Sequence, residues 1–155
     1  MLKANDQAPL DIKVLDQNGE TSNLRHLLGQ KVLLYFYPRD NTPGCTLEAC
    51  NFRDANSEIS AKNIQIIGVS QDSLASHEKF ANKHQLNFPL WSDPDHQLMV
   101  AFGAWGEKKL AGRKYFGTIR STFLINENGQ IVKTWPKVKS KTHAQEVLEF
   151  IEQTY

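Results

Sequence analysis

The fold is decided by the stretch Lys31-Val32-Leu33-Leu34-Tyr35-Phe36-Tyr37-Pro38-Arg39-Asp40-Asn41-Thr42-Pro43-Gly44-Cys45. Its first half is a continuous apolar and aromatic run, which is typical of a central strand buried on both faces. Pro38 ends this run because proline has no backbone N–H to donate to a neighbouring strand. Thr42 and Pro43 predict a helix start, with threonine as the N-cap and proline in the first helical position. The stretch therefore predicts a strand, a loop and a helix with Cys45 in its first turn.

Elements of both kinds alternate along the rest of the chain. Asn18-Gly19 and Asn128-Gly129 each predict a β-hairpin, one near the N-terminus and one before the last helix. The apolar pattern predicts further strands at 12–15, 20–21, 64–70, 90–91, 121–125 and 130–135, and helices at 43–59, 74–84, 96–102 and 142–153. This order is typical of an α/β fold with a central mixed β-sheet flanked by helices and an N-terminal β-hairpin. Flavodoxin-like topology is the alternative, but a terminal hairpin followed by a helix favours a thioredoxin-like fold.

The composition indicates one soluble domain spanning residues 1–155. Hydrophobic residues make up 40% of the chain, and 18 Lys+Arg against 17 Asp+Glu give a net charge of +1. No basic stripe or acidic tail is present, which argues against binding to nucleic acid or to an anionic membrane surface. The longest apolar run, 32–37, is too short to cross a bilayer, and the first residues are polar. We expect an intracellular, cytoplasmic protein.

The two cysteines, Cys45 and Cys50, are the strongest chemical signal in the sequence. A close pair in a reducing compartment is more often catalytic, redox-sensing or metal-binding than structural. The first turn of a helix has free backbone N–H groups and the positive end of the helix dipole, and both stabilise a thiolate. Cys45 is therefore predicted to be a nucleophile. The Thr42 hydroxyl is expected on the same face, where it could bond to the sulfur or to a substrate oxygen.

The spacing of Cys45 and Cys50 determines whether an intact helix could hold a disulfide between them. On an ideal helix, residues five apart have Cα atoms about 8.5 Å from one another. A disulfide requires a Cα separation of roughly 4.4–6.8 Å. If these two sulfurs form a bond, the first turn of the helix must unwind, and the oxidised protein should be locally melted over residues 42–52.

Metal and histidine chemistry receive little support from the sequence. A zinc site would need a second Cys/His pair at ligand spacing, and the histidines do not provide one. They stand mostly in polar contexts, so we expect them to be solvated, and no metal or cofactor is predicted. These histidines are His26, His77, His84, His96 and His143.

In addition to these local signals, the sequence resembles a known family. The pattern Pro38-x-x-x-Thr42-x-x-Cys45 is similar to the active-site signature of peroxiredoxins, and the string 36–54 resembles the bacterioferritin comigratory protein (peroxiredoxin Q) subfamily. Further matches lie at 68–72, 88–93 and 119–125, and the resemblance covers nearly the whole chain.

The resemblance implies a thiol-dependent peroxidase that reduces hydrogen peroxide and organic hydroperoxides. It implies that Cys45 is the peroxidatic cysteine, that Cys50 resolves its sulfenic acid as an intramolecular disulfide, and that Thr42 orients the peroxide. Arg120 is implied to favour the thiolate and Pro38 to shield the sulfenate. Glu48 is implied to hold the arginine, although an acidic residue in a first helical turn also complements the dipole. Thioredoxin or a similar dithiol is the implied reductant, and the protein is expected to be a monomer.

Three other functions are compatible with the residues alone. A dithiol oxidoreductase would favour Cys-x-x-Cys, which the wider spacing here does not match. A non-enzymatic redox sensor could use the same melting of the helix to expose a binding surface. An α/β binding module with incidental cysteines would not depend on Cys45.

Overall fold

A seven-stranded mixed sheet forms the centre of the computed structural model, which describes residues 1–155. Its strand order is β2-β1-β5-β4-β3-β8-β9. β3 (Lys31–Phe36) lies between β4 (Ile64–Ser70), which is parallel to it, and β8 (Ser121–Ile125), which is antiparallel. β5 (Leu90–Ser92) pairs in parallel with β4, and β9 (Ile131–Trp135) pairs antiparallel with β8. The predicted mixed sheet is therefore confirmed.

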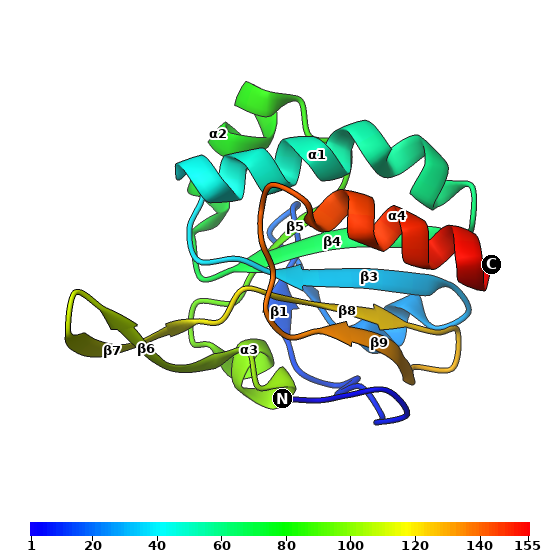
Figure 1. Ribbon diagram of the computed structural model, residues 1–155, viewed down its shortest axis with the longest axis horizontal. Helices are drawn as coiled ribbons and strands as arrows, with labels where there is room; N and C mark the ends of the chain where they lie inside the picture. Colours follow the sequence, from blue (N-terminus) through cyan, green and yellow to red (C-terminus); the bar gives the residue numbers. More distant parts are fainter.

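Two hydrophobic cores, one on each face of the sheet, explain the continuous apolar run in β3. Side chains alternate along a strand, so Leu33 and Tyr35 enter one core and Val32 and Leu34 the other. The first core is covered by α1 (Pro43–Ser60), α2 (Leu74–His84) and α4 (His143–Thr154). The second is covered by α3 (Gln97–Phe102), the 3₁₀ helix η1 (Leu24–Leu27) and the N-terminal segment. Figure 1 shows the three longer helices on one side of the sheet.

The predicted N-terminal hairpin is present but shorter than expected. β1 (Val14–Leu15) and β2 (Thr21–Ser22) pair antiparallel, and β1 joins the hairpin to β5 through Leu15 and Ser92.

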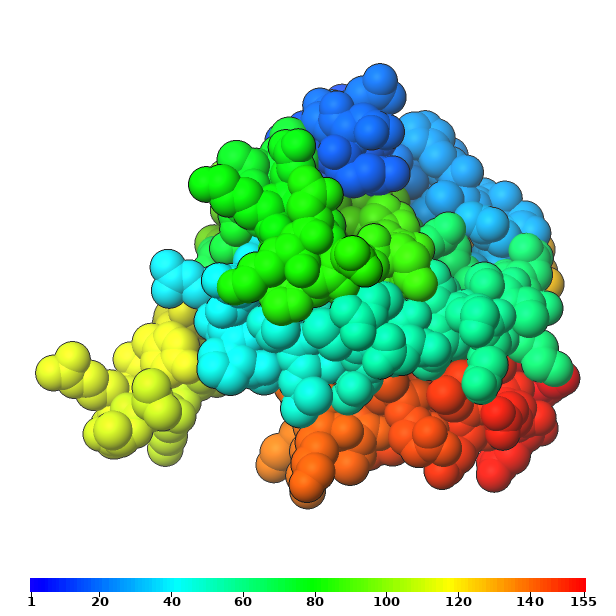
Figure 2. Space-filling view, turned by 90° about the horizontal axis from the view of Figure 1, so that it is seen from above, coloured from blue at the N-terminus to red at the C-terminus, as the bar shows by residue number.

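A second hairpin was not predicted. β6 (Trp105–Leu110) and β7 (Arg113–Thr118) form a separate two-stranded sheet joined by Ala111 and Gly112, which both have positive φ. Two such residues make the tight turn that suits the twist of a hairpin. The hairpin projects from the body of the molecule in both views (Figures 1 and 2). Its second strand leads directly into Arg120 and β8.

The start of α1 follows the prediction. Thr42 is extended and serves as N-cap, and Pro43 occupies the first turn, although the Thr42 side chain makes no capping hydrogen bond. Seen from above, α1 lies between α2 and α4 (Figure 2). None of the helices is both long and apolar enough to span a membrane.

Candidate active site

Cys45 lies in the first turn of α1 and is almost completely buried, at 1% exposure. The first helical hydrogen bond runs from Thr46 N to the Thr42 carbonyl, so the N–H groups before it have no partner within the helix. Gly44 leaves space for the neighbouring side chains, because an added Cβ would lie 3.5 Å from Arg120 Nη2 and 3.3 Å from Ser140 Oγ. The Cys45 sulfur therefore lies close both to the free N–H groups of the first helical turn and to the Arg120 guanidinium.

Arg120 joins the sulfur to a buried carboxylate. Its Nη2 donates to Cys45 Sγ at 3.0 Å, and its Nη1 donates to Glu48 Oε1 at 2.7 Å. Burial opposes the charge of Arg120, but Glu48 and Cys45 outweigh it and raise the pKa of the guanidinium. The arginine is thus held as a cation, oriented by the carboxylate on one side and directed at the sulfur on the other.

Glu48 is fully buried one turn after Cys45. Burial raises the pKa of Glu48 to about 7, although the charge and hydrogen bond of Arg120 act in the opposite direction. Its second oxygen, Oε2, has no hydrogen-bond partner. The contact with Arg120 agrees with the role that the resemblance implies for Glu48. Because Glu48 is buried, its position is not explained by an exposed acidic residue that complements the helix dipole.

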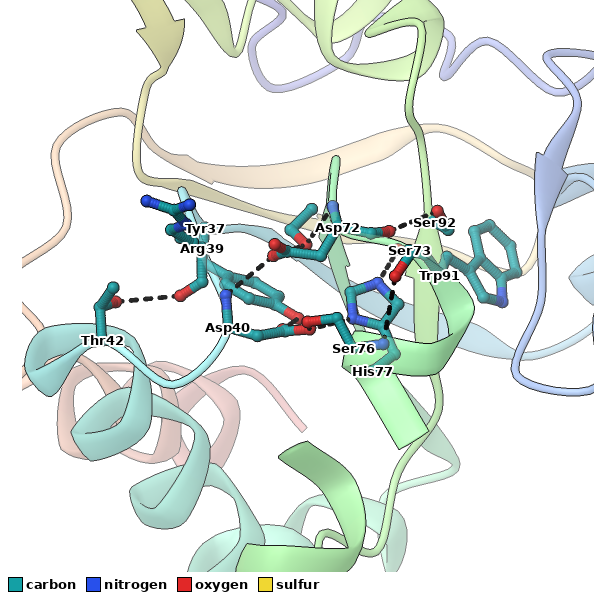
Figure 3. Close-up of polar contacts among 11 residues, drawn as sticks. Tyr37, Arg39, Asp40, Thr42, Asp72, Ser73, Ser76, His77, Trp91 and Ser92 are labelled. Atoms are coloured by element: carbon teal, nitrogen blue, oxygen red, sulfur yellow. Dashed lines mark hydrogen bonds and ion pairs between the residues drawn. The ribbon is translucent and has the colours of Figure 1, made fainter. Parts of the chain in front are cut away.

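Thr42 and Pro38 lie at the two ends of the preceding loop. The Thr42 hydroxyl donates to the Arg39 carbonyl at 2.9 Å (Figure 3). It makes no hydrogen bond with Cys45 Sγ. Its oxygen lone pairs remain able to accept a hydrogen bond from a ligand. Pro38 lies two residues after the end of β3 and is partly exposed.

Cys50 lies on the same helix as Cys45, and both thiols are free. Cys50 is partly exposed, whereas Cys45 is buried, and α1 is continuous from Pro43 to Ser60 across both positions. The reduced protein therefore has the intact helix whose geometry keeps the two sulfurs from bonding.

Lys108 is a cation near this site that the sequence did not predict. It lies on β6 in the unpredicted hairpin, and its Nζ donates to the Thr118 carbonyl at 2.8 Å. Burial lowers the pKa of Lys108, the charge of Arg120 acts in the same direction, and that of Cys45 opposes both. β6 was not predicted because its charged residues interrupt the alternation of apolar and polar residues that indicates a strand.

The expectation that the histidines are solvated is wrong for two of them. His77 and His143 are buried, at 3% and 0% exposure. Burial lowers the pKa of His143 to about 4, and the charge of Arg120 acts in the same direction. No local pattern indicates this burial, because each ring is buried by elements distant along the chain: Trp91 contacts His77, and Thr122 contacts His143.

Comparison with known proteins agrees with this arrangement. The AhpC/TSA family matches residues 4–134, and the chain therefore belongs to that family of thiol peroxidases. It is 45% identical over 148 residues to peroxiredoxin Bcp of Bacillus subtilis, which covers 96% of this chain and 94% of that protein. Peroxiredoxin Bcp of Escherichia coli K12 is 42% identical over 152 residues, covering 98% and 97% of the two chains.

Solved structures give the same result. The bacterioferritin comigratory protein of Xanthomonas campestris, from a study of its alkyl peroxide reduction, superposes with a TM-score of 0.90 at 37% identity over 98% of both chains. A cysteine-to-serine mutant of Xylella fastidiosa PrxQ superposes with a TM-score of 0.92 at 35% identity, covering 99% of this chain and 97% of the other. The predicted thioredoxin-like fold, the peroxiredoxin activity and the resemblance to the bacterioferritin comigratory protein (peroxiredoxin Q) subfamily are confirmed.

Proposed function

We propose that Cys45 is the peroxidatic cysteine and that Arg120, Thr42 and Pro38 complete its site. The observation that carries this proposal is the position of Arg120, whose guanidinium contacts Cys45 Sγ at 3.0 Å while Glu48 holds it from the other side at 2.7 Å. A fixed cation and helix N–H groups favour the anionic sulfur, which is the nucleophilic form.

In the proposed reaction, the thiolate of Cys45 attacks one oxygen of a hydroperoxide. A sulfur–oxygen bond forms, the O–O bond breaks, and the second oxygen leaves as water or an alcohol after taking up one proton. Arg120 and the backbone donors stabilise the charge that develops on the two oxygens, and such pre-oriented donors supply a large part of many rate enhancements. The Thr42 hydroxyl, which donates to Arg39, accepts a hydrogen bond from the O–H of the incoming peroxide and orients it. Pro38 limits access of a second peroxide.

We propose that Cys50 resolves the sulfenic acid. Its sulfur attacks Cys45, a disulfide forms, and one water molecule is released. Because α1 is continuous across both cysteines, this step requires the first turns of the helix to unwind. A dithiol reductant of the thioredoxin type then reduces the disulfide by thiol–disulfide exchange, which restores both thiols and oxidises the reductant.

The resolving cysteine on the same chain supports a monomer, because no second subunit is needed to complete the cycle. We also propose that residues 1–155 act as one domain, since strands from both ends of the chain join one sheet. A reducing cytoplasm, which keeps thiols free, suits both cysteines.

Intact mass after one equivalent of peroxide tests the residue assignment. We expect the wild-type protein to lose two hydrogens, about 2 Da, and Cys50→Ser to gain one oxygen, about 16 Da, at Cys45. Cys45→Ser should stay unchanged and serves as the control. An oxidised Cys45→Ser variant, or a wild-type protein that accumulates the oxygen adduct without a disulfide, would contradict the assignment.

A further inference from the structure

Asp40 lies in the loop between β3 and α1, and its side chain is only 3% exposed. Its carboxylate accepts three hydrogen bonds: from Tyr37 Oη at 2.6 Å, from Ser76 Oγ at 2.8 Å and from His77 Nδ1 at 2.7 Å (Figure 3). Tyr37 lies just beyond β3, and Ser76 and His77 lie on α2. The loop that leads to Cys45 is thus tied to the second helix by a buried anion.

The main chain of Asp40 makes a separate contact. Its backbone N–H donates to Asp72 Oδ2 at 2.8 Å, and the same oxygen accepts from Ser70 Oγ at 2.7 Å. Asp40, Asp72 and His77 could be taken for metal ligands because their ligand atoms lie within 4.8 Å of one another. The N–H and O–H donors already occupy the lone pairs that a metal ion would need. The group is therefore a hydrogen-bond network.

His77 lies between two groups that accept hydrogen bonds. Nδ1 faces Asp40 Oδ2 at 2.7 Å, and Nε2 lies 3.0 Å from the Trp91 carbonyl (Figure 3). A carbonyl oxygen only accepts, so Nε2 must donate to Trp91, and Nδ1 makes the hydrogen bond with Asp40. The ring therefore bridges the loop at Asp40 and β5 at Trp91.

The other titratable groups around His77 fit this arrangement. Burial raises the pKa of Tyr37 well above its ordinary value, so its hydroxyl keeps the proton that it donates to Asp40. Asp72 is engaged by Ser70 and by the Asp40 backbone. His77 therefore links the Asp40 carboxylate to the Trp91 carbonyl, and removing the ring would break both buried contacts.

We propose that Asp40 and His77, with Ser76, form a loop clamp that holds the loop before Cys45 in the conformation that reacts with peroxide. The inference rests on the proposed function in one respect, namely that Cys45 must later leave the helix to meet Cys50. The clamp fixes the chain at residue 40, so unwinding is confined to the residues after it. Asp40 and His77 are positioning residues, because neither touches the sulfur.

Weakening the clamp should act on the two steps of the cycle in different ways. The helical form of residues 42–52 reacts with peroxide, and the unwound form makes the disulfide. A variant without the clamp populates the unwound form more, so oxidation of Cys45 slows while disulfide formation does not. A general loss of folding would slow both steps.

Rapid-quench mass spectrometry separates the two steps, because oxygen addition and disulfide formation change the mass in opposite directions. The variants are Asp40→Asn and His77→Asn, and the matched control is His26→Asn at an exposed histidine. We expect both clamp variants to lower the rate constant for oxidation about tenfold, the size of one lost charge-assisted hydrogen bond. Disulfide formation should be as fast as in wild type or faster, and the control should match wild type. Equal slowing of both steps, or oxidation unchanged in both variants, would overturn the proposal.

Side-chain ¹⁵N NMR of the reduced wild-type protein tests the clamp without any variant. We expect His77 Nε2 to carry a proton, because it donates to the Trp91 carbonyl. A His77 ring with a bare Nε2 would overturn the proposal. The NMR result concerns the reduced protein only, so it stands even if Cys50 proves not to be the resolving cysteine.

Discussion

Replacing Glu48 with glutamine should change how the stability of the protein depends on pH. Glu48 is fully buried, and its pKa rises from an ordinary value of 4.5 to about 7 on folding. Between these values the folded state holds a proton that the unfolded state has released. The free energy of unfolding contributed by Glu48 is therefore fully present below about pH 4.5 and is lost as the pH rises towards 7.

The expected size follows from the shift. One pKa unit corresponds to about 1.4 kcal/mol, so the rise of the Glu48 pKa from 4.5 to about 7 corresponds to about 3.5 kcal/mol in full, of which about 3 kcal/mol is lost between these two pH values. Glutamine keeps the shape and does not titrate. The unfolding free energy of wild type minus that of Glu48→Gln should therefore fall by about 3 kcal/mol between about pH 4.5 and pH 7.

The difference between two proteins is needed because His143 acts in the opposite direction. Its pKa falls from 6.5 to about 4 on folding, so the unfolded state binds more protons in that range and stability rises with pH. In the wild-type curve the two effects largely cancel over the pH range that they share. Subtracting the curve of the variant removes the contribution of His143.

Urea unfolding of the reduced proteins, followed by far-ultraviolet circular dichroism across this pH range, measures the difference. Glu58→Gln is the matched control, because Glu58 is an exposed carboxylate on the same helix. Its difference from wild type should stay constant with pH. A constant difference for Glu48→Gln as well, or one that grows with pH, would refute the account of the buried Glu48–Arg120 pair.

Three further predictions concern the reaction and the packing. Arg120→Lys should lower the rate of peroxide consumption about a hundredfold, because lysine cannot contact Glu48 and the sulfur through a planar fork; a rate within threefold of wild type would contradict this. Hydrogen exchange of the oxidised protein should show lost amide protection over residues 42–52 and retained protection in β4, whereas protection retained in both would exclude unwinding. Gly68→Ala should destabilise the protein by about 1–3 kcal/mol in urea unfolding, because its Cβ would lie 2.9 Å from Tyr35 and Leu90; unchanged stability would mean that these side chains move easily.

Much of the fold could be predicted because its signals are local. The apolar run of β3, the proline that follows it and the Thr42-Pro43 helix start each depend on neighbouring residues, and all three occur as predicted. The β6–β7 hairpin was missed because its strands carry charged residues on both faces and its turn is Ala111-Gly112 rather than Asn-Gly.

The burial of individual polar residues could not be predicted, because it depends on packing between distant segments. Nothing near Glu48 in the sequence indicates that Arg120, 72 positions later, will reach it. The same holds for His77, which is buried against Asp40 and Trp91 from two other parts of the chain. The family resemblance predicted that Arg120 lies near the Cys45 sulfur, whereas only the structure shows that His77 is buried.

We propose that the position of the Cys45 sulfur, next to Arg120 and at the start of α1, makes it react rapidly with peroxide. The most direct test is the second-order rate constant of the reduced protein with hydrogen peroxide at neutral pH, measured beside free cysteine. We expect Cys45 to react about a thousandfold faster than free cysteine or more, in line with what oriented donors contribute elsewhere. A rate constant close to that of free cysteine would contradict it.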